Sequence, residues 1–267
     1  MASNLIGMTT VAIRAFTTTQ IAALTTADFL AFTSDQVRAL TTAQIQAIET
    51  RDLAALPSQI SNNLSTDQIV ALSTQQFAAF TTSQMAAMTT AQVAAATTEQ
   101  VASMTTAQTA ALTSRQIAQG LSTDQVVALS TAQVAALTTA QISQGLTTDQ
   151  LAALETRDIA AMSTAGIAAL TTKQLALGLT TAQVVALTTA QAAGLTTQQI
   201  SLGLTTQHVS VIETADFAAL KTGQIAALTT SQVRLGLRTD QIVALTTAQV
   251  TALTTAQINQ GLSTLQV

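Results

Sequence analysis

The stretch that decides the fold is LSTAQVAA (129–136), LTTAQISQG (137–145) and LTTDQLAA (146–153), three successive variants of one phrase. The phrase has eight residues, and the middle copy carries a ninth, Gly145. Repetition at a fixed period is the signature of architectures in which each unit buries its apolar face against neighbouring units. The eight positions of the phrase are numbered here from its leading apolar residue.

The repeat fills the chain from Met8 onward, with 32 repeat starts, the last at Leu262. The consensus is L-T-T-x-Q-I-x-A: position 1 is apolar, position 6 nearly always so, and position 3 is Thr or Ser. We predict an N-terminal flank at 1–7 and a single repeat domain at 8–267. Because the last repeat is incomplete, we expect the chain to belong to a longer array.

Each repeat is predicted to form one short α-helix, because Thr or Ser before A-Q-I-A-A is typical of a helix N-cap. We favour position 3 as the cap, since position 2 includes Pro57, which has no side-chain acceptor. In the alternative register, position 2 caps and the Gln at position 5 closes a capping box. One continuous helix is disfavoured because a period of eight fits neither 3.6 nor 3.5 residues per turn. A β-solenoid is disfavoured by the Ala-rich interior.

The ninth residue marks the turn of a superhelix. Gly ends the nine-residue repeats at intervals of 25, 33, 25, 33 and 25 residues, which alternate between three and four repeats. This alternation predicts an all-α solenoid with about 3.5 repeats per superhelical turn. We expect the ninth residue to widen a corner by adopting positive φ, which Gly and Asn tolerate. The predicted corner residues are Asn63, Gly120, Gly145, Gly178, Gly203, Gly236 and Gly261.

The composition argues against several functions. There is no Cys, so disulfides and thiolate metal sites are excluded. Nine scattered Lys and Arg and a net charge of −4 provide no basic stripe for a nucleic acid. Thr pairs interrupt every apolar run, so we expect no membrane span. With no catalytic constellation and no glycine-rich phosphate loop, we expect no enzymatic activity and no cofactor.

Two kinds of side chain are candidate ligand sites. E-T-x-D occurs three times and places two carboxylates one helical turn apart, which is a weak candidate for Ca²⁺. Favourable placement of acids at a helix N-terminus is the preferred explanation. The pairs are Glu49 and Asp52, Glu155 and Asp158, and Glu213 and Asp216. The one histidine, His208, replaces the Gln of position 5 and is interpreted as a polar substitute for it.

The repeats resemble the Thr/Gln/Ala-rich octapeptide arrays of large secreted bacterial exoproteins of the adhesion or haem-utilisation type. The resemblance covers Met8 to Val267 and depends on L-T-T-x-Q-[IV]-x-A. It implies an extracellular or cell-surface location and a structural role, as a spacer or presenting stalk that supports adhesion through a surface glycan or protein ligand. Two alternatives stay open: parallel rows of Thr that bind a repetitive ligand such as glycan, mineral or ice, and end-to-end self-association into filaments.

Overall fold

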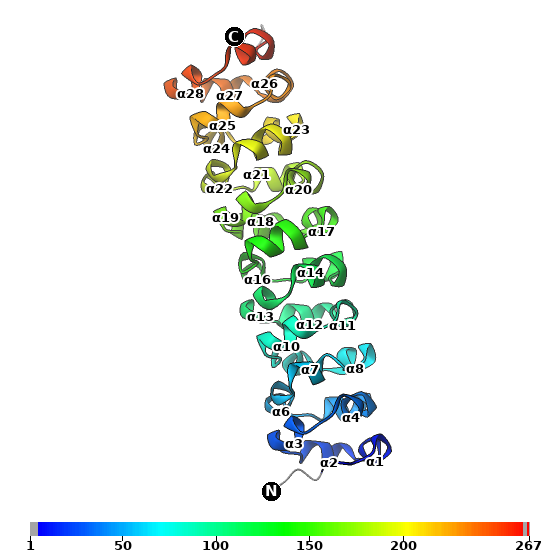
Figure 1. Ribbon diagram of the computed structural model, residues 1–267. Coiled ribbons are helices and arrows are strands. Elements are labelled where there is room, and N and C mark those ends of the chain that lie inside the picture. Colours follow the sequence, from blue (N-terminus) through cyan, green and yellow to red (C-terminus); the bar gives the residue numbers. More distant parts are fainter. Residues whose placement is uncertain (1–4, 264–265, 267) are drawn as a thin grey trace. The chain divides into compact units, whose positions relative to one another are not determined.

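The computed structural model describes residues 5–263 and residue 266, which are helical and contain no strand (Figure 1). Part of the predicted flank, 1–4, and part of the last repeat, 264–265 and 267, lie outside the described residues. The chain divides into two compact units, Met1–Ala136 and Leu137–Val267. The single repeat domain at 8–267 therefore stays a prediction.

Both units are built in the same way, from one short helix per repeat. The helices of the first unit are α1 (Thr10–Arg14), α2 (Thr18–Ala22), α3 (Thr26–Leu30), α4 (Ser34–Ala39), α5 (Thr42–Gln46), α6 (Thr50–Ala55), α7 (Ser58–Ser61), α8 (Thr66–Ala71), α9 (Thr74–Ala78), α10 (Thr82–Ala87), α11 (Thr90–Ala95), α12 (Thr98–Ser103), α13 (Thr106–Ala111), α14 (Ser114–Gly120), α15 (Thr123–Val127) and α16 (Thr131–Ala135).

The second unit contains α-helices and three π-helical turns, which are labelled η. They are η1 (Gln141–Gly145), α17 (Thr148–Ala153), α18 (Thr156–Ala161), α19 (Thr164–Ala169), α20 (Thr172–Gly178), α21 (Thr181–Val185), α22 (Thr189–Gly194), η2 (Gln199–Gly203), α23 (Thr206–Val211), α24 (Thr214–Ala218), α25 (Thr222–Ala227), α26 (Thr230–Gly236), α27 (Thr239–Val243), α28 (Thr247–Thr251) and η3 (Gln257–Gly261).

The N-cap is position 2, so the preference for position 3 was wrong. On α12, the hydroxyl oxygen of Thr97 accepts a hydrogen bond from the backbone N–H of Gln100 at 3.2 Å. The side-chain oxygen of Gln100 accepts one from the backbone N–H of Thr97 at 2.9 Å. This reciprocal capping box satisfies two backbone donors that the first helical turn leaves free. The Gln at position 5 is therefore a fixed part of the cap, which explains why the box outweighs a cap at position 3.

Some repeats lack a capping side chain at position 2. Pro57 and Glu49 provide no side-chain cap to α7 and α6. Lys221 likewise has no acceptor, but the Gln224 side chain still accepts from the Lys221 backbone N–H at 2.6 Å. Half of a box thus survives when position 2 loses its hydroxyl. These helices have four to six residues and are too short to be stable alone, so they depend on packing.

The packing confirms the solenoid and its 3.5-repeat turn within each unit. Helix α12 packs against α9 and α15, which are three repeats before and after it. The side-chain amide of Gln100 on α12 also reaches the carbonyl of Ile69 on α8, four repeats earlier, and that of Leu72, which directly follows α8. A helix that has neighbours both three and four repeats away lies in a turn of between three and four repeats. The same relations recur in the second unit, where α20 packs on α17 and bonds to residues of η1 and its following turn.

The core consists of the apolar side chains at positions 1 and 6. Leu, Ile, Val and Met dominate it, and five of the six Phe are at most 3% exposed. These are Phe29, Phe32, Phe77, Phe80 and Phe217; Phe16 is only half-buried. Thr109 occupies a fully buried position 6, and its hydroxyl donates to the carbonyl of Thr105 at 3.1 Å. The buried hydroxyl is thus satisfied within its own helix.

The predicted corner residues do not adopt positive φ, so that part of the prediction was wrong. Among the described residues, only Gly7 has a positive φ, of 83°. The nine-residue repeats instead continue their helix to the ninth residue. In α14, the N–H of Leu121 donates to the carbonyl of Gln116, five residues earlier, whereas in the octad before it the N–H of Leu112 reaches only Thr109. The extra residue therefore adds a π-type bond at the helix end.

Glycine is required at these helix ends by close packing. A Cβ added to Gly178 would lie 3.1 Å from both the Cα and the carbonyl oxygen of Thr148, on α17. A Cβ on Gly236 would lie 2.9 Å from the carbonyl oxygen of Thr206, on α23. Asn63 follows the four-residue helix α7, and its side-chain amide donates to the carbonyl of Gln59 at 2.8 Å. Asn63 thus ends its helix with a side-chain bond, not with a left-handed backbone.

Candidate functional site

The most regular polar feature is a ladder of buried Gln side chains at position 5. Each side chain uses both ends of its amide. In Gln76, the oxygen accepts from the backbone N–H of Ser73 at 2.9 Å, while the nitrogen donates to the carbonyls of Ile45 and Ile48 at 2.9 and 2.8 Å. The Gln76 side chain is 5% exposed, so these backbone groups find their partners in the amide and not in water.

Each Gln of the ladder takes part in the cap of its own helix and also bonds to the preceding turn. Its members include Gln36, Gln44, Gln68, Gln84, Gln92, Gln100, Gln116, Gln125, Gln133, Gln174, Gln183, Gln191, Gln199, Gln224, Gln232, Gln241, Gln249 and Gln257. From the sequence, this Gln was predicted only to take part in an alternative cap. The recurrence of Gln at position 5 in most repeats is the signal for its second role.

His208 takes the place of the amide in the ladder, as the sequence suggested. Its Nδ1 accepts from the backbone N–H of Thr205 at 3.3 Å, and its Nε2 lies 3.0 Å from the carbonyl of Leu179. These partners require the neutral tautomer with the proton on Nε2. Burial lowers the pKa of His208 below its ordinary value, although the bond to the Leu179 carbonyl partly opposes this effect.

The E-T-x-D residues use their carboxylates within the fold. Asp52 is 1% exposed and accepts a hydrogen bond from the hydroxyl of Thr26, on α3, at 2.6 Å. Asp216 does the same with Thr189, on α22, at 2.6 Å. Asp52 and Asp216 therefore link position 5 to the helix three repeats earlier, in place of the amide contact to the fourth.

Salt bridges complete two of the three E-T-x-D motifs. The guanidinium of Arg51 lies 2.9 Å from Glu49 and 3.6 Å from Asp52. Arg157 lies 2.8 Å from Glu155 and 3.7 Å from Asp158. Within the described part of the chain, no group of three or more His, Asp or Glu residues is placed to hold a metal ion. The preferred explanation, acids at a helix N-terminus, is consistent with Asp52 and Asp216 in first turns.

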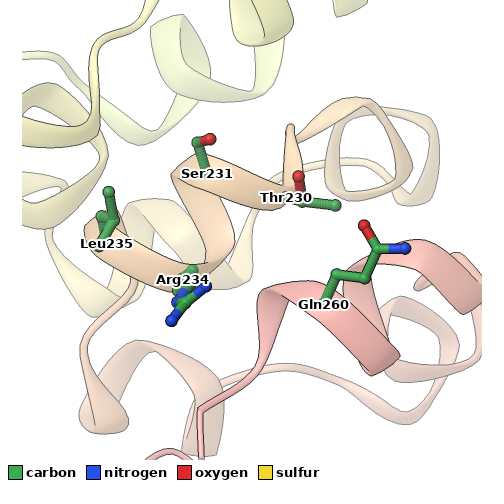
Figure 2. A pocket seen from close by; sticks show the side chains of 5 residues that line it. All are labelled: Thr230, Ser231, Arg234, Leu235 and Gln260. Atoms are coloured by element: carbon green, nitrogen blue, oxygen red, sulfur yellow. The ribbon is translucent and has the colours of Figure 1, made fainter.

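The surface carries shallow hollows between neighbouring helices. One of about 330 Å³ is lined by Thr230, Ser231, Arg234 and Leu235 of α26 and by Gln260 of η3 (Figure 2). A second, of about 620 Å³, shares Arg234 and Gln260 and adds Asn259, Leu262 and Ser263. Together they make up the Arg234 hollow, where a guanidinium, amides and hydroxyls surround one exposed leucine. In residues 5–263, no helix has the length and apolarity that a membrane crossing needs.

Comparison with known proteins identifies the repeat. The family described as ALTTAQ repeat matches residues 45–82, 63–98, 119–156, 151–189 and 209–247, which together cover more than half of the chain. The chain belongs to the ALTTAQ repeat family. No curated protein matches it significantly.

Among solved structures, the chain is similar to a leucine-rich repeat-containing protein, LegL7, from Legionella pneumophila. The identity is 9%, and the alignment covers 84% of this chain and 77% of that one. The TM-score is 0.22, which is too low to support an argument about fold or function. The assignment as a helical repeat protein therefore depends on the ALTTAQ match and on the helices themselves.

Proposed function

We propose that this array of ALTTAQ repeats is a spacer or presenting stalk in a secreted or surface-attached bacterial protein, where it supports adhesion. The observation that carries the proposal is the amide ladder. Most repeats are joined by a Gln side chain to the helix four repeats earlier, and the helices pack on those three repeats earlier. Such nearest-turn contacts let an array grow by addition of repeats without redesign of its core.

The side-chain chemistry supports a structural role. The position-5 amides, which in another fold could bind a ligand, are buried and bonded to backbone groups. The hydroxyls at position 2 accept the cap bonds, whereas those at position 3 take no part in the caps. The alternative of a repetitive ligand surface would therefore have to use the hydroxyls at position 3.

The spacer proposal is tested by changing the array length in whole turns. Residues 121–178 comprise seven repeats, which is two turns at 3.5 repeats each, and their deletion joins Gly120 to Leu179 as two in-phase repeat boundaries. Deletion of 121–145 removes three repeats, which is half a repeat less than one turn, and so leaves the following repeats out of phase. Each variant is displayed between a cell-surface anchor and a small binding domain, and capture of ligand-coated beads is measured.

We expect the 58-residue deletion to fold but to present the binding domain less far from the cell, so that bead capture falls. The out-of-phase deletion should lose helical content and cooperative unfolding. Equal capture by the full array and by the folded, shortened array would contradict a spacer role. Thermal-hysteresis and neutral-glycan binding assays on the same proteins test the Thr rows, and sedimentation against concentration tests end-to-end association.

A further inference from the structure

The arginine side chains of this chain differ in whether the fold uses their charge. Within the described residues, Arg51, Arg157 and Arg238 form ion pairs, and Arg38 and Arg115 donate to side-chain amide oxygens. Arg14 and Arg234 have neither kind of partner there. Arg234 lies in the hollows described above, whereas Arg14 lines none of them. Arg234 therefore combines an uncommitted guanidinium with a shaped surface.

Arg234 lacks a hydrogen-bond partner that Arg38 has at the same position of its repeat. Arg38 is at position 7 of its repeat and donates through Nη2 to the side-chain oxygen of Asn63, three repeats on, at 2.8 Å. Arg234 is also at position 7, and Gln260, three repeats on, faces the same hollow (Figure 2). In the described structure the Arg234 donors are not bonded to Gln260. An oxygen anion that enters the hollow would find guanidinium donors available in the fork geometry that suits a carboxylate.

The rest of the lining favours a polyhydroxylated ligand. Thr230, Ser231 and Ser263 offer hydroxyls, and Asn259 and Gln260 offer amides, all of which donate and accept. Leu235, which is 71% exposed, offers an apolar surface to the C–H face of a sugar ring. The smaller hollow, of about 330 Å³, lies at the lower end of the range of about 300–1,000 Å³ for small-molecule sites.

We propose that the Arg234 hollow binds a carboxylated saccharide, with the carboxylate on Arg234 and the ring hydroxyls on the amides and hydroxyls of α26 and η3. The hollow is open and cannot surround its ligand, so binding is weak, with a Kd on the order of 1 mM for one sugar unit. This site goes beyond the spacer role and does not depend on it, because a stalk needs no ligand of its own.

The test is a titration of the ¹⁵N-labelled full chain, followed by NMR chemical shifts. The probes are methyl β-D-glucuronide, the neutral methyl β-D-glucoside, sodium acetate and a blocked Asp-Asp dipeptide. The variants are Arg234→Gln and Arg14→Gln, which remove the same charge from position 7 of two repeats. Arg234 is exposed, so both variants should keep the circular dichroism spectrum of the parent.

We expect the glucuronide to shift amide signals of residues 230–235 and 259–263, and Arg234→Gln to weaken its binding about tenfold or more. Arg14→Gln should leave that binding unchanged, and the glucoside and acetate should each bind more weakly than the glucuronide. Three results would each overturn the proposal: equal binding of glucoside or acetate, equal losses in the two variants, or tighter binding of the acidic dipeptide. If neither variant nor parent shows saturable shifts, the site does not exist.

Discussion

Replacement of Gln76 by Leu tests the amide ladder directly. The substitution keeps a side chain of similar size but removes both ends of the amide. It leaves the backbone N–H of Ser73 and the carbonyls of Ile45 and Ile48 without the partners that Gln76 gives them. A buried backbone group left without a partner costs about 1–3 kcal/mol. The Ile45 carbonyl keeps the backbone N–H of Ile48 as a partner, so two groups lose their partner and together cost about 2–6 kcal/mol.

Part of this cost is offset, because the new leucine buries apolar surface. Burial of a Leu side chain contributes about 1.5–3 kcal/mol. The free energy of unfolding should therefore fall by about 1–3 kcal/mol in Gln76→Leu. The neighbouring residue provides a matched control: Gln75 is exposed at position 4 of the same repeat, and Gln75→Leu should change stability by no more than about 0.5 kcal/mol.

Urea unfolding followed by circular dichroism compares the two variants, and hydrogen exchange shows where the loss occurs. In Gln76→Leu, the amide of Ser73 should lose protection, because Gln76 is its partner. If Gln76→Leu were as stable as Gln75→Leu, or if its Ser73 amide stayed protected, the Gln side chains would not connect the turns.

Three further changes test other parts of the structure. Gly178→Ala should destabilise the chain by about 1–3 kcal/mol in thermal unfolding, because the new Cβ meets the backbone of Thr148. Gly223→Ala, whose Cβ has only one neighbour at 4.0 Å, should stabilise the chain by up to about 1 kcal/mol in the same measurement. Lys221→Thr should add about 1 kcal/mol by restoring a cap, and no rise in urea midpoint would refute this. Burial lowers the pKa of His208, so the unfolded chain takes up the proton first. The contribution of His208 to the free energy of unfolding should be constant above pH 6.5 and fall below it, by at most about 1.4 kcal/mol per pH unit. Urea melts of His208→Gln should not show this loss between pH 6.5 and 5.

The period of the repeat and the spacing of the glycines that end the nine-residue repeats were sufficient to predict the helical solenoid and the number of repeats per turn. Alternation of three and four repeats between glycines depends only on counting, and the packing partners of α12 agree with it. The choice of cap failed because Pro57 was taken to exclude position 2. A single repeat without a cap costs about 1 kcal/mol, which the packing of neighbouring turns can offset.

The reason for glycine at the helix ends could not be predicted from the sequence alone. A Cβ has no room at Gly178, because Thr148, 30 residues earlier in the sequence, lies against it. The contact between the two residues is set by the packing of successive turns. Positive φ is the local explanation for glycine, and here a contact distant in sequence replaces it. In the same way, the acidic residues Asp52 and Asp216 have their partners three repeats away, so their local sequence could not distinguish a cation site from a hydrogen bond.

The short reach of the ladder has a consequence for how the chain folds. In the part of the chain that the structure describes, the hydrogen bond with the largest sequence separation joins Gln266 to Val233, 33 residues apart. Each turn can therefore close as soon as a few dozen residues are free, without waiting for the remainder of the polypeptide. At synthesis rates of about 5–20 residues per second, this takes seconds. A chain threaded through a narrow channel would become ordered progressively as it emerged, and each newly closed turn would oppose its slipping back.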